Sequence, residues 1–391
     1  MDYSKYVSKK ASVIKPSGIR KFFDIVSEKK GAISLGVGEP DFDTPWSGRN
    51  NAINVIRKGY THYTSNWGIA ELRKMIARYY RERYSLEYCD KSEVLVTIGG
   101  SEAIDAALRA LVNDGDGVLI PDPSYVSYSP LVTLAGGRCV PVSCEEKSGF
   151  KITPENLGKA IDDGCRILIL SYPNNPTGAI MELSDYEAIA QLIVENDLIV
   201  ISDEIYSELT YGKRHASPAN VPALKERTVV VNGFSKAFAM TGWRLGYALA
   251  PKEIISVMFK VHQYAIMCAP TVSQYAALAC LEECFETDFK VIDEMREEYE
   301  NRRRFVVSEL KRMGLRCFQP EGAFYVFACV KNYGLDGEEF ANALLDKQLV
   351  AVVPGEAFGR FGKDYIRISY AYSIKDLSKA LSRIEKFLSE L

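Results

Sequence analysis

Five short apolar runs in the middle of the chain constrain its fold more than any other feature. They lack the alternation of apolar and polar residues that a half-exposed strand shows, so each is typical of a strand buried on both faces. Segments with helical periodicity lie between several of them. The runs are VLVTI (94–98), VLI (118–120), ILIL (167–170), LIVI (198–201) and TVVV (228–231). Strands that alternate with helices predict an α/β fold, with a mostly parallel sheet covered by helices on both faces.

Small or polar residues follow each of these runs. In chain order the following segments are GGSEA, PDPSY, SYPNNPTG, SDEIY and NGFSK. The carboxyl ends of parallel strands meet at one edge of a sheet, and open α/β proteins bind their ligands there. We therefore expect the five segments to converge on one binding site.

The character of the chain changes from about residue 286. Seven apolar residues recur at helical spacing among many charges, which predicts a long amphipathic helix leading into a second domain. They are Phe289, Ile292, Met295, Tyr299, Val306, Leu310 and Met313. GAFYVFACV, LVAVVP and YIRISYAY then resemble strands, and a closing helix follows from residue 374. We predict a large domain, 46–287, and a smaller α+β domain built from 1–45 and 288–391.

Charge and cysteine content limit the classes of partner. The chain has 48 lysines and arginines against 51 aspartates and glutamates, a formal charge of -3, which offers no basic surface for nucleic acid or an anionic membrane. Its nine cysteines form no CxxC pair, so we interpret them as reduced thiols and expect no metal site. Neither a signal-peptide core nor a run of about 18 apolar residues occurs. We expect a cytoplasmic protein that binds a small molecule.

The segment GGSEA predicts an anion site. Two glycines and a serine open a helix directly after a buried strand. Free backbone N–H groups and the positive end of the helix would then face the ligand edge, which suits a phosphate. An ordinary helix N-cap at Ser101 is the alternative that the residues leave open.

Lys236 and Asp203 are charged residues in unusually apolar surroundings. Lys236 lies in GFSKAFAMTGW, and a lysine with little water around it loses its proton readily and becomes a nucleophile able to form a Schiff base. Asp203 ends the run LIVISD and needs a cationic partner because it is poorly hydrated. A helix N-cap is the alternative for Asp203, and Glu204 beside it is expected to pair with a surface base.

Two further residues at the ligand edge are candidates for recognition. Asn175, in the loop SYPNNPTG, offers an amide. Tyr125 is either a core aromatic or a face on which a flat ring stacks. The three histidines, His62, His215 and His262, are too scattered to indicate a metal site or a hydrolytic triad, and we interpret them as structural or surface residues.

One cofactor requires all of these groups together. A phosphate cradle, a desolvated lysine, a buried acid, a stacking tyrosine and an amide suit pyridoxal 5'-phosphate. It is a charged aldehyde whose ring nitrogen must be protonated to act as an electron sink.

With these residues in place, the sequence resembles the class I, fold type I, pyridoxal-phosphate-dependent aminotransferases, and among them the prokaryotic aspartate and aromatic amino-acid aminotransferases. The motifs that carry the resemblance are GVGEPDFDTP, THYTSNWGIAELR, YPNNPTG, SDEIY, FSKAFAMTGWRLGY, GAFYVF, VVPGEAFG and YIRISYA. The resemblance implies a seven-stranded sheet sandwiched by helices and a homodimer with shared active sites. It also implies transfer of the α-amino group of an aromatic or aspartate-type L-amino acid to 2-oxoglutarate by a ping-pong mechanism.

The resemblance also implies roles around the cofactor ring. Lys236 would form the Schiff base and then move the proton. Asp203 would pair with the ring nitrogen, Asn175 and Tyr206 would hydrogen-bond the phenolic oxygen, and Tyr125 would stack on the ring.

The phosphate and the substrate have their own implied ligands. Arg367 would bind the substrate carboxylate, assisted by Gly38 and Asn175. Tyr63 would reach the phosphate from the other subunit. The remaining phosphate ligands would be Gly100, Ser101, Glu102, Ser235 and Arg244.

One departure and two alternatives accompany this interpretation. Many members have a serine three residues before the lysine, where this chain has Gly233, so the phosphate grip would depend more on Ser235 and Arg244. A β-elimination lyase acting on a sulfur amino acid is the enzymatic alternative. A non-catalytic sensor module is the other, but the residues before ISLGVGEPD contain no helix-turn-helix or basic cluster.

Overall fold

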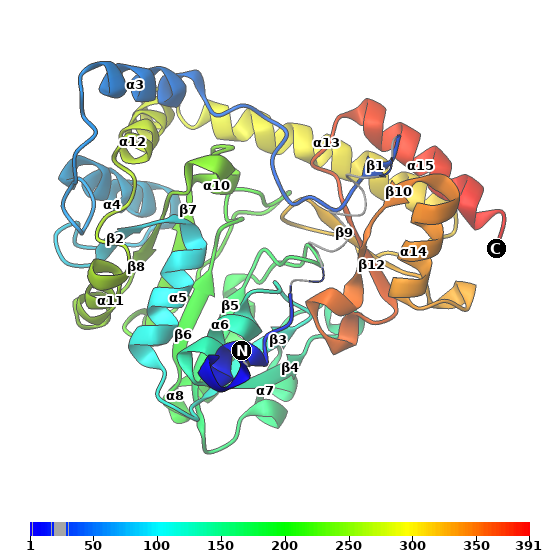
Figure 1. Cartoon of the computed structure of the whole chain (residues 1–391), viewed down its shortest axis with the longest axis horizontal. Coiled ribbons are helices and arrows are strands. Elements are labelled where there is room, and N and C mark those ends of the chain that lie inside the picture. Colours follow the sequence, from blue (N-terminus) through cyan, green and yellow to red (C-terminus); the bar gives the residue numbers. More distant parts are fainter. Residues whose placement is uncertain (2, 17, 19–28, 30) are drawn as a thin grey trace.

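A seven-stranded sheet forms the centre of the computed structural model, which describes all residues except 2, 17, 19–28 and 30 (Figure 1). The strand order is β2-β8-β7-β6-β5-β3-β4. β8 runs antiparallel to both of its neighbours, and the other pairings described in this sheet are parallel. The strands are β2 (Val94–Thr97), β3 (Gly117–Asp122), β4 (Arg138–Ser143), β5 (Cys165–Ser171), β6 (Ile199–Asp203), β7 (Thr228–Gly233) and β8 (Gly246–Leu249).

Five of these strands are the predicted apolar runs, and the mostly parallel sheet is confirmed. β4 is not among the runs because it is an edge strand with exposed residues at Arg138 and Pro141. β8 has only four residues, GYAL, too few for a pattern to be distinguished from a turn.

Helices cover both faces of this sheet, as an α/β fold requires. One face packs against α5 (Gly99–Leu111), α6 (Tyr128–Ala135) and α11 (Lys252–Ala265). The opposite face packs against α4 (Ala70–Tyr84), α12 (Thr271–Glu286), α7 (Pro154–Ala160), α8 (Leu183–Glu195) and α9 (Pro222–Lys225). Successive residues of β6 and β7 alternate between the two faces, so Ile201 and Val231 contact the first group while Val200 and Val230 contact the second.

A second, smaller body is built mainly from the C-terminal part of the chain and lies beside the large sheet in Figure 1. Its antiparallel sheet has the order β11-β12-β9, and β1 pairs with β10 in parallel. These strands are β1 (Ile33–Ser34), β9 (Tyr325–Cys329), β10 (Val350–Ala351), β11 (Val353–Pro354) and β12 (Tyr365–Ser369). The predicted domain boundaries stay a prediction.

The long helix predicted after residue 286 is α13 (Lys290–Arg312), and the closing helix is α15 (Ile374–Leu388). Figure 1 shows α13 extending between the two bodies, with α14 (Gly337–Gln348) and α15 packed on the smaller one. The other helices are α1 (Lys9–Ser12), α3 (Trp46–Arg57) and the short α10 (Phe234–Ala237). Within the described ranges, none of the helices has both the length and the apolar character needed to cross a lipid bilayer.

Candidate active site

Lys236 lies on α10, immediately after β7. Its Nζ donates a hydrogen bond to the carbonyl oxygen of Gly38, 2.7 Å away, in the segment between β1 and α3. Burial lowers the pKa of Lys236 to about 8; the carboxylate of Glu39 opposes this shift, and the charges of Arg367 and Arg244 add to it. The amine therefore loses its proton more readily than an exposed lysine, as the apolar surroundings in the sequence predict.

Asp203 ends β6 and points to the face covered by α5 and α6. Its Oδ2 accepts a hydrogen bond from the hydroxyl of Tyr128 at 2.7 Å, and Oδ1 accepts from the N–H of Ile205 at 3.2 Å. Burial raises the pKa of the Asp203 carboxyl, and these two donors act against that rise. The helix N-cap alternative is wrong, because a turn rather than a helix follows Asp203.

Arg367, on β12, is the arginine that the structure buries most deeply at this edge. Its Nη1 donates to Oδ1 of Asn175 at 2.8 Å and its Nη2 to the carbonyl oxygen of Gly36 at 2.5 Å. The guanidinium lies over the rings of Tyr325 and Phe358, with centroid distances of 4.3 and 4.7 Å. Its Nε is buried and has no hydrogen-bond partner among the described residues. A carboxylate would supply the missing acceptor.

Three tyrosines lie around this group. The hydroxyls of Tyr206 and Tyr325 are 2.7 Å apart, and the two rings meet edge to face. Tyr125 is partly exposed in the loop after β3, with its ring edge-on to Tyr128 at 5.7 Å. A fully buried core position for Tyr125 is therefore excluded.

The first turn of α5 forms a tight cradle. Gly99 adopts a left-handed φ of +72°, and a Cβ placed on it would lie 3.0 Å from Nη2 of Arg244. A Cβ on Gly246 would lie 2.5 Å from the carbonyl carbon of Gly99, so β8 reaches the helix end only because glycine stands there. Backbone N–H groups of α5 and the guanidinium of Arg244 thus share one corner, beside a surface hollow of about 530 Å³ that Arg244 and Trp243 line.

Close packing at this corner explains why residue 233 is a glycine. A Cβ there would lie 3.0 Å from both the Cα of Gly246 and the carbonyl oxygen of Leu245. The serine found in many family members would therefore require these backbone atoms to shift.

The other residues predicted to hold the phosphate have different surroundings. Ser235 is buried on α10, next to Lys236. Ser101 is exposed inside the first turn of α5 and is not its N-cap, which is Ile98, so the N-cap alternative is wrong. Both carboxylate oxygens of Glu102 are already bonded, one to the N–H of Ile98 at 2.6 Å and one to Nδ1 of His262 at 2.7 Å. Only the backbone of Glu102 is left for a ligand.

Tyr63 lies apart from this hydrogen-bonded group. It is 81% exposed in the loop after α3. In the part of the chain that the structure describes, no hydrogen bond or ring contact joins Tyr63 to another predicted site residue.

The expectation for Glu204 is wrong. Its side chain is fully buried and pairs with His215 at 3.0 Å instead of with a surface base. The sequence shows only an acid beside Asp203, whereas strand alternation turns Glu204 to the opposite face of the sheet.

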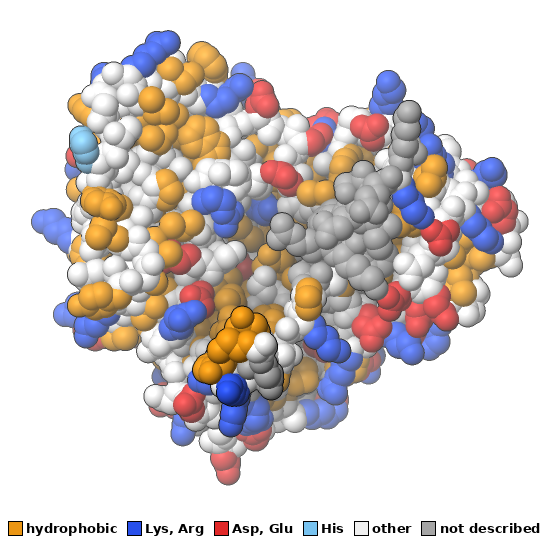
Figure 2. Space-filling view, in the orientation of Figure 1, with side chains coloured by type: hydrophobic (Ala, Val, Ile, Leu, Met, Phe, Trp, Pro, Cys, Tyr) orange, Lys and Arg blue, Asp and Glu red, His pale blue; other side chains and the backbone are white. Residues whose placement is uncertain are grey.

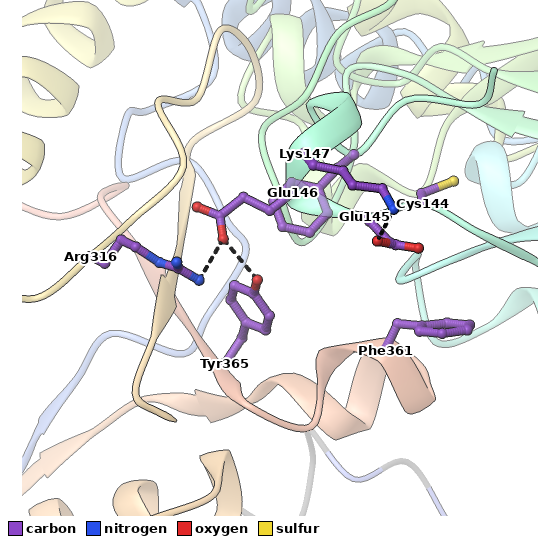
Figure 3. Close-up of a pocket in the computed structure, with 8 residues that line it drawn as sticks. Cys144, Glu145, Glu146, Lys147, Arg316, Phe361 and Tyr365 are labelled. Carbon is purple, nitrogen blue, oxygen red and sulfur yellow. Dashed lines mark hydrogen bonds and ion pairs between the residues drawn. The ribbon is translucent and has the colours of Figure 1, made fainter. Parts of the chain in front are cut away.

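A separate hollow of about 570 Å³ lies between the loop after β4 and β12 (Figure 3). The charged side chains that line it are paired: Glu146 binds Arg316 and Tyr365, each at 2.9 Å, and Lys147 binds Glu145 at 2.9 Å. None of the predicted site residues lines it. We assign the chemistry to the edge of the large sheet.

Comparison with known proteins identifies the family of the chain. The family model of aminotransferase class I and II matches residues 30–384. The chain belongs to this family.

Individual relatives of this aminotransferase match it almost end to end. A putative aminotransferase of Bacillus subtilis strain 168, YugH, is 47% identical over 98% of this chain and 99% of its own. The aspartate aminotransferase of Pyrococcus abyssi is 44% identical, covering 98% of each chain. The crystal structure of an aromatic aminotransferase from Pyrococcus horikoshii OT3 superposes with a TM-score of 0.90, at 44% identity, over 95% of this chain and 99% of that one.

The family and the fold predicted from the sequence are thereby confirmed. Enzymes of this family use pyridoxal 5'-phosphate, and this chain is a pyridoxal-phosphate-dependent aminotransferase. Its own residues fit the cofactor. The glycines let β8 and Arg244 approach the first turn of α5, where backbone N–H groups suit a phosphate. The amine of Lys236 has a lowered pKa, and the buried carboxylate of Asp203 forms no ion pair among the described residues.

Two site residues were not predicted. Tyr128 holds Asp203, and Tyr325 contacts both Tyr206 and Arg367. Tyr128 follows Tyr125 by one helical turn in SYVSY, which is a weak local signal. Nothing local marks Tyr325, because it joins the site from β9, 119 residues after Tyr206.

Proposed function

We propose that Lys236 is the residue that binds the cofactor covalently and then moves the proton at the substrate Cα. The observation that carries this assignment is a lysine at the sheet edge whose pKa is lowered to about 8 by burial and by the charges of Arg367 and Arg244, against the opposite effect of Asp203. The bound cofactor supplies the electron sink. Lys236 acts first as general base and then as general acid.

The surrounding side chains orient the ring. Asp203, held by Tyr128, pairs with the ring nitrogen, and Tyr125 covers one ring face. Asn175 and Tyr206 reach the phenolic oxygen. The backbone of Gly100, Ser101 and Glu102, together with Ser235 and Arg244, holds the phosphate.

The substrate carboxylate binds Arg367. Its unpartnered Nε lies on the same side of the guanidinium as Nη2, and these two nitrogens form a two-pronged donor of the kind that carboxylates prefer. Gly38 and Asn175 complete the contact. The donor is an aromatic or aspartate-type L-amino acid and the acceptor is 2-oxoglutarate, in a ping-pong cycle. The names of the aspartate and aromatic relatives support this substrate class.

Replacing Lys236 tests the function. Lys236→Ala is expected to abolish the visible absorbance of the covalently bound cofactor and to lower kcat by at least about 10⁴-fold, because both the covalent link and the proton carrier are lost. Absorbance spectra and single-turnover assays measure both effects. A variant that retained the spectrum and the turnover would contradict the role of Lys236.

A panel of amino donors with 2-oxoglutarate tests the substrate class. We expect phenylalanine, tyrosine or aspartate to give the highest kcat/KM. Parallel lines in double-reciprocal plots would support the ping-pong cycle, since the two substrates then never occupy the site together. Release of pyruvate and ammonia from a sulfur amino acid, without transfer to 2-oxoglutarate, would favour a lyase instead.

We also propose a homodimer in which Tyr63 serves the phosphate of the other subunit. Large apolar side chains are exposed along α3, the loop after it and the end of α11: Trp46, Ile53, Ile56, Tyr60, Tyr63, Tyr264 and Met267. Thr271 Oγ1, at the start of α12, donates to the carbonyl oxygen of His62 at 2.7 Å, so the loop after α3 lies against the start of α12. Figure 2 shows apolar side chains gathered on this side of the molecule. Exposed apolar patches of this kind support association.

A further inference from the structure

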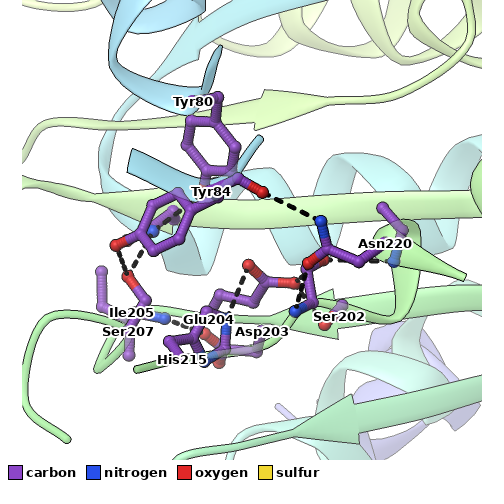
Figure 4. A network of polar contacts seen from close by, with 12 residues as sticks. Tyr80, Tyr84, Ser202, Asp203, Glu204, Ile205, Ser207, His215 and Asn220 are labelled. Carbon is purple, nitrogen blue, oxygen red and sulfur yellow. Dashed lines mark hydrogen bonds and ion pairs between the residues drawn. The ribbon is translucent and has the colours of Figure 1, made fainter. Parts of the chain in front are cut away.

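Buried polar side chains lie behind the ends of β6 and β7, the strands that lead to Asp203 and Lys236 (Figure 4). Asp203 faces α5 and α6, whereas Ser202 and Glu204 point to the opposite side of the sheet, toward α4. Asn232, at the end of β7, points the same way as Glu204 and donates to the hydroxyl of Tyr80 on α4 at 2.8 Å.

The carboxylate of Glu204 is held by three side chains. Its Oε1 accepts from the hydroxyls of Ser202 at 2.9 Å and Ser217 at 2.6 Å, and its Oε2 lies 3.0 Å from Nε2 of His215. The ring of His215 in turn packs edge to face against Tyr84 on α4, at 5.6 Å. Glu204 is therefore fixed in direction as well as buried.

The same layer ties the two strands together. The N–H of Glu204 donates to the carbonyl oxygen of Val231 on β7 at 2.8 Å. Oγ of Ser207 accepts from Nδ2 of Asn232 at 3.0 Å and from the hydroxyl of Tyr84 at 2.9 Å. Motion of Glu204 would thus move the segment that begins with Asp203.

Folding alone does not explain a carboxylate at this place. Val200 and Val230 occupy equivalent positions on the same face with apolar side chains. Replacement of a buried charged pair by apolar residues is often neutral or stabilising. A buried acid here suggests an electrostatic purpose.

Glu204 is close enough to act on Asp203 through its charge. Burial is the main cause of the raised pKa of Asp203, and the carboxylate of Glu204 adds to it. A second negative charge behind Asp203 favours a cation in front of it.

We propose that Glu204, held by His215, is a positioning residue for Asp203. It fixes the direction of that carboxylate and adds negative charge behind it, which favours a protonated ring nitrogen in the bound cofactor. The inference rests on the proposed role of Asp203 toward the ring nitrogen.

Titration with two ligands distinguishes this role from a general destabilisation of the fold. The full-length chain, freed of cofactor, is titrated with pyridoxal 5'-phosphate and with an analogue that has a ring carbon in place of the ring nitrogen. Glu204→Gln is expected to weaken binding of the natural cofactor about tenfold. This is the effect of lowering the pKa of the bound ring nitrogen by about one unit. Affinity for the analogue should stay within about twofold of the parent, because the analogue has no nitrogen for Asp203 to hold.

Matched variants provide the controls. Glu208→Gln removes a second buried carboxylate four residues away, one that binds Arg83 instead of His215, and should not discriminate between the two ligands. His215→Gln keeps an N–H donor for Glu204 and should bind the cofactor more tightly than His215→Leu. If Glu204→Gln does not fold by circular dichroism, His215→Leu supplies the same two-ligand comparison.

Each outcome decides one claim. Equal weakening of both ligands, or no change for either, overturns the role of Glu204. Failure of the parent chain to bind the natural cofactor more tightly than the analogue contradicts instead the role of Asp203 in the proposed function.

Discussion

Lys236 shows how a reactive residue opposes stability. Burial shifts its pKa from 10.5 to about 8. At 1.36 kcal/mol per pKa unit, the charged form of Lys236 therefore lowers the free energy of unfolding by about 3 kcal/mol. Because the folded-state pKa is the lower one, the penalty is fully present below pH 8 and disappears as the pH rises toward the unfolded value. A neutral side chain of similar length at this position avoids the penalty.

We therefore expect Lys236→Met to stabilise the cofactor-free protein by about 2–3 kcal/mol at pH 7 and by much less at pH 10. Urea unfolding at both pH values measures the effect. Lys260→Met, at an exposed position of α11, is the control and should change stability by less than about 0.5 kcal/mol. Equal stability of Lys236→Met and the parent at pH 7 would show that the amine is not desolvated.

At the scale of elements, α4 connects the large sheet with α13. Arg83 binds Glu208 through Nη2 at 2.8 Å and Asp293 at 3.3 Å. Burial disfavours the charge on Glu208, but the hydrogen bonds and charge of Arg83, with the hydroxyls of Tyr79 and Tyr84, hold its pKa below the usual range. The buried carboxylate thus joins the segment after β6 to α4, and Arg83 joins α4 to α13.

Glu208→Gln is expected to destabilise the fold by about 3–5 kcal/mol at pH 7, because it removes the buried partner of Arg83 and leaves only the more exposed Asp293, at 3.3 Å. The folded-state pKa of Glu208 is lowered, so its stabilising effect is present above the unfolded pKa of about 4.3 and is lost as the pH falls further. Thermal unfolding from pH 7 to pH 3 should show the difference from the parent shrinking. Glu82→Gln, in the exposed pair with Arg78, should cost less than about 0.5 kcal/mol; a similar loss in both variants would contradict the role of Glu208.

For the whole molecule, the open question is whether one chain makes a complete site. Tyr63 is a predicted phosphate ligand that is 81% exposed in the single chain, and the apolar residues around it are exposed as well. A second copy packed on this side would cover the apolar surface and bring another Tyr63 to each phosphate cradle. A site shared between two subunits would explain both the exposed Tyr63 and the exposed apolar residues around it.

Mixed dimers test this arrangement. Tyr63→Ala and Lys236→Ala are each expected to impair the homodimer, but a purified heterodimer of the two should regain about half of the parental activity, because one of its two sites has both residues. Turnover per heterodimer, after separation by different affinity tags, is the measurement. Activity no greater than that of Tyr63→Ala would mean that Tyr63 serves its own subunit, and a monomeric mass in sedimentation would exclude the shared site.

The sequence by itself determined the sheet and the chemistry at its edge. Apolar runs with polar ends identify strands and their ligand-facing termini, because hydrogen bonding and burial act on neighbouring residues. For the same reason, the apolar neighbours of Lys236 indicate a desolvated amine, and those of Asp203 a buried acid. These inferences need no knowledge of which distant segments meet.

Only the tertiary structure decided the contacts between distant segments. Gly38 meets Lys236 across 198 residues, and Tyr325 meets Tyr206 across 119. Glu204 resembles a surface acid in the sequence, yet strand alternation and the packing of α4 bury it beside His215. Such contacts arise when separate segments of the chain pack together, so no local pattern of residues encodes them.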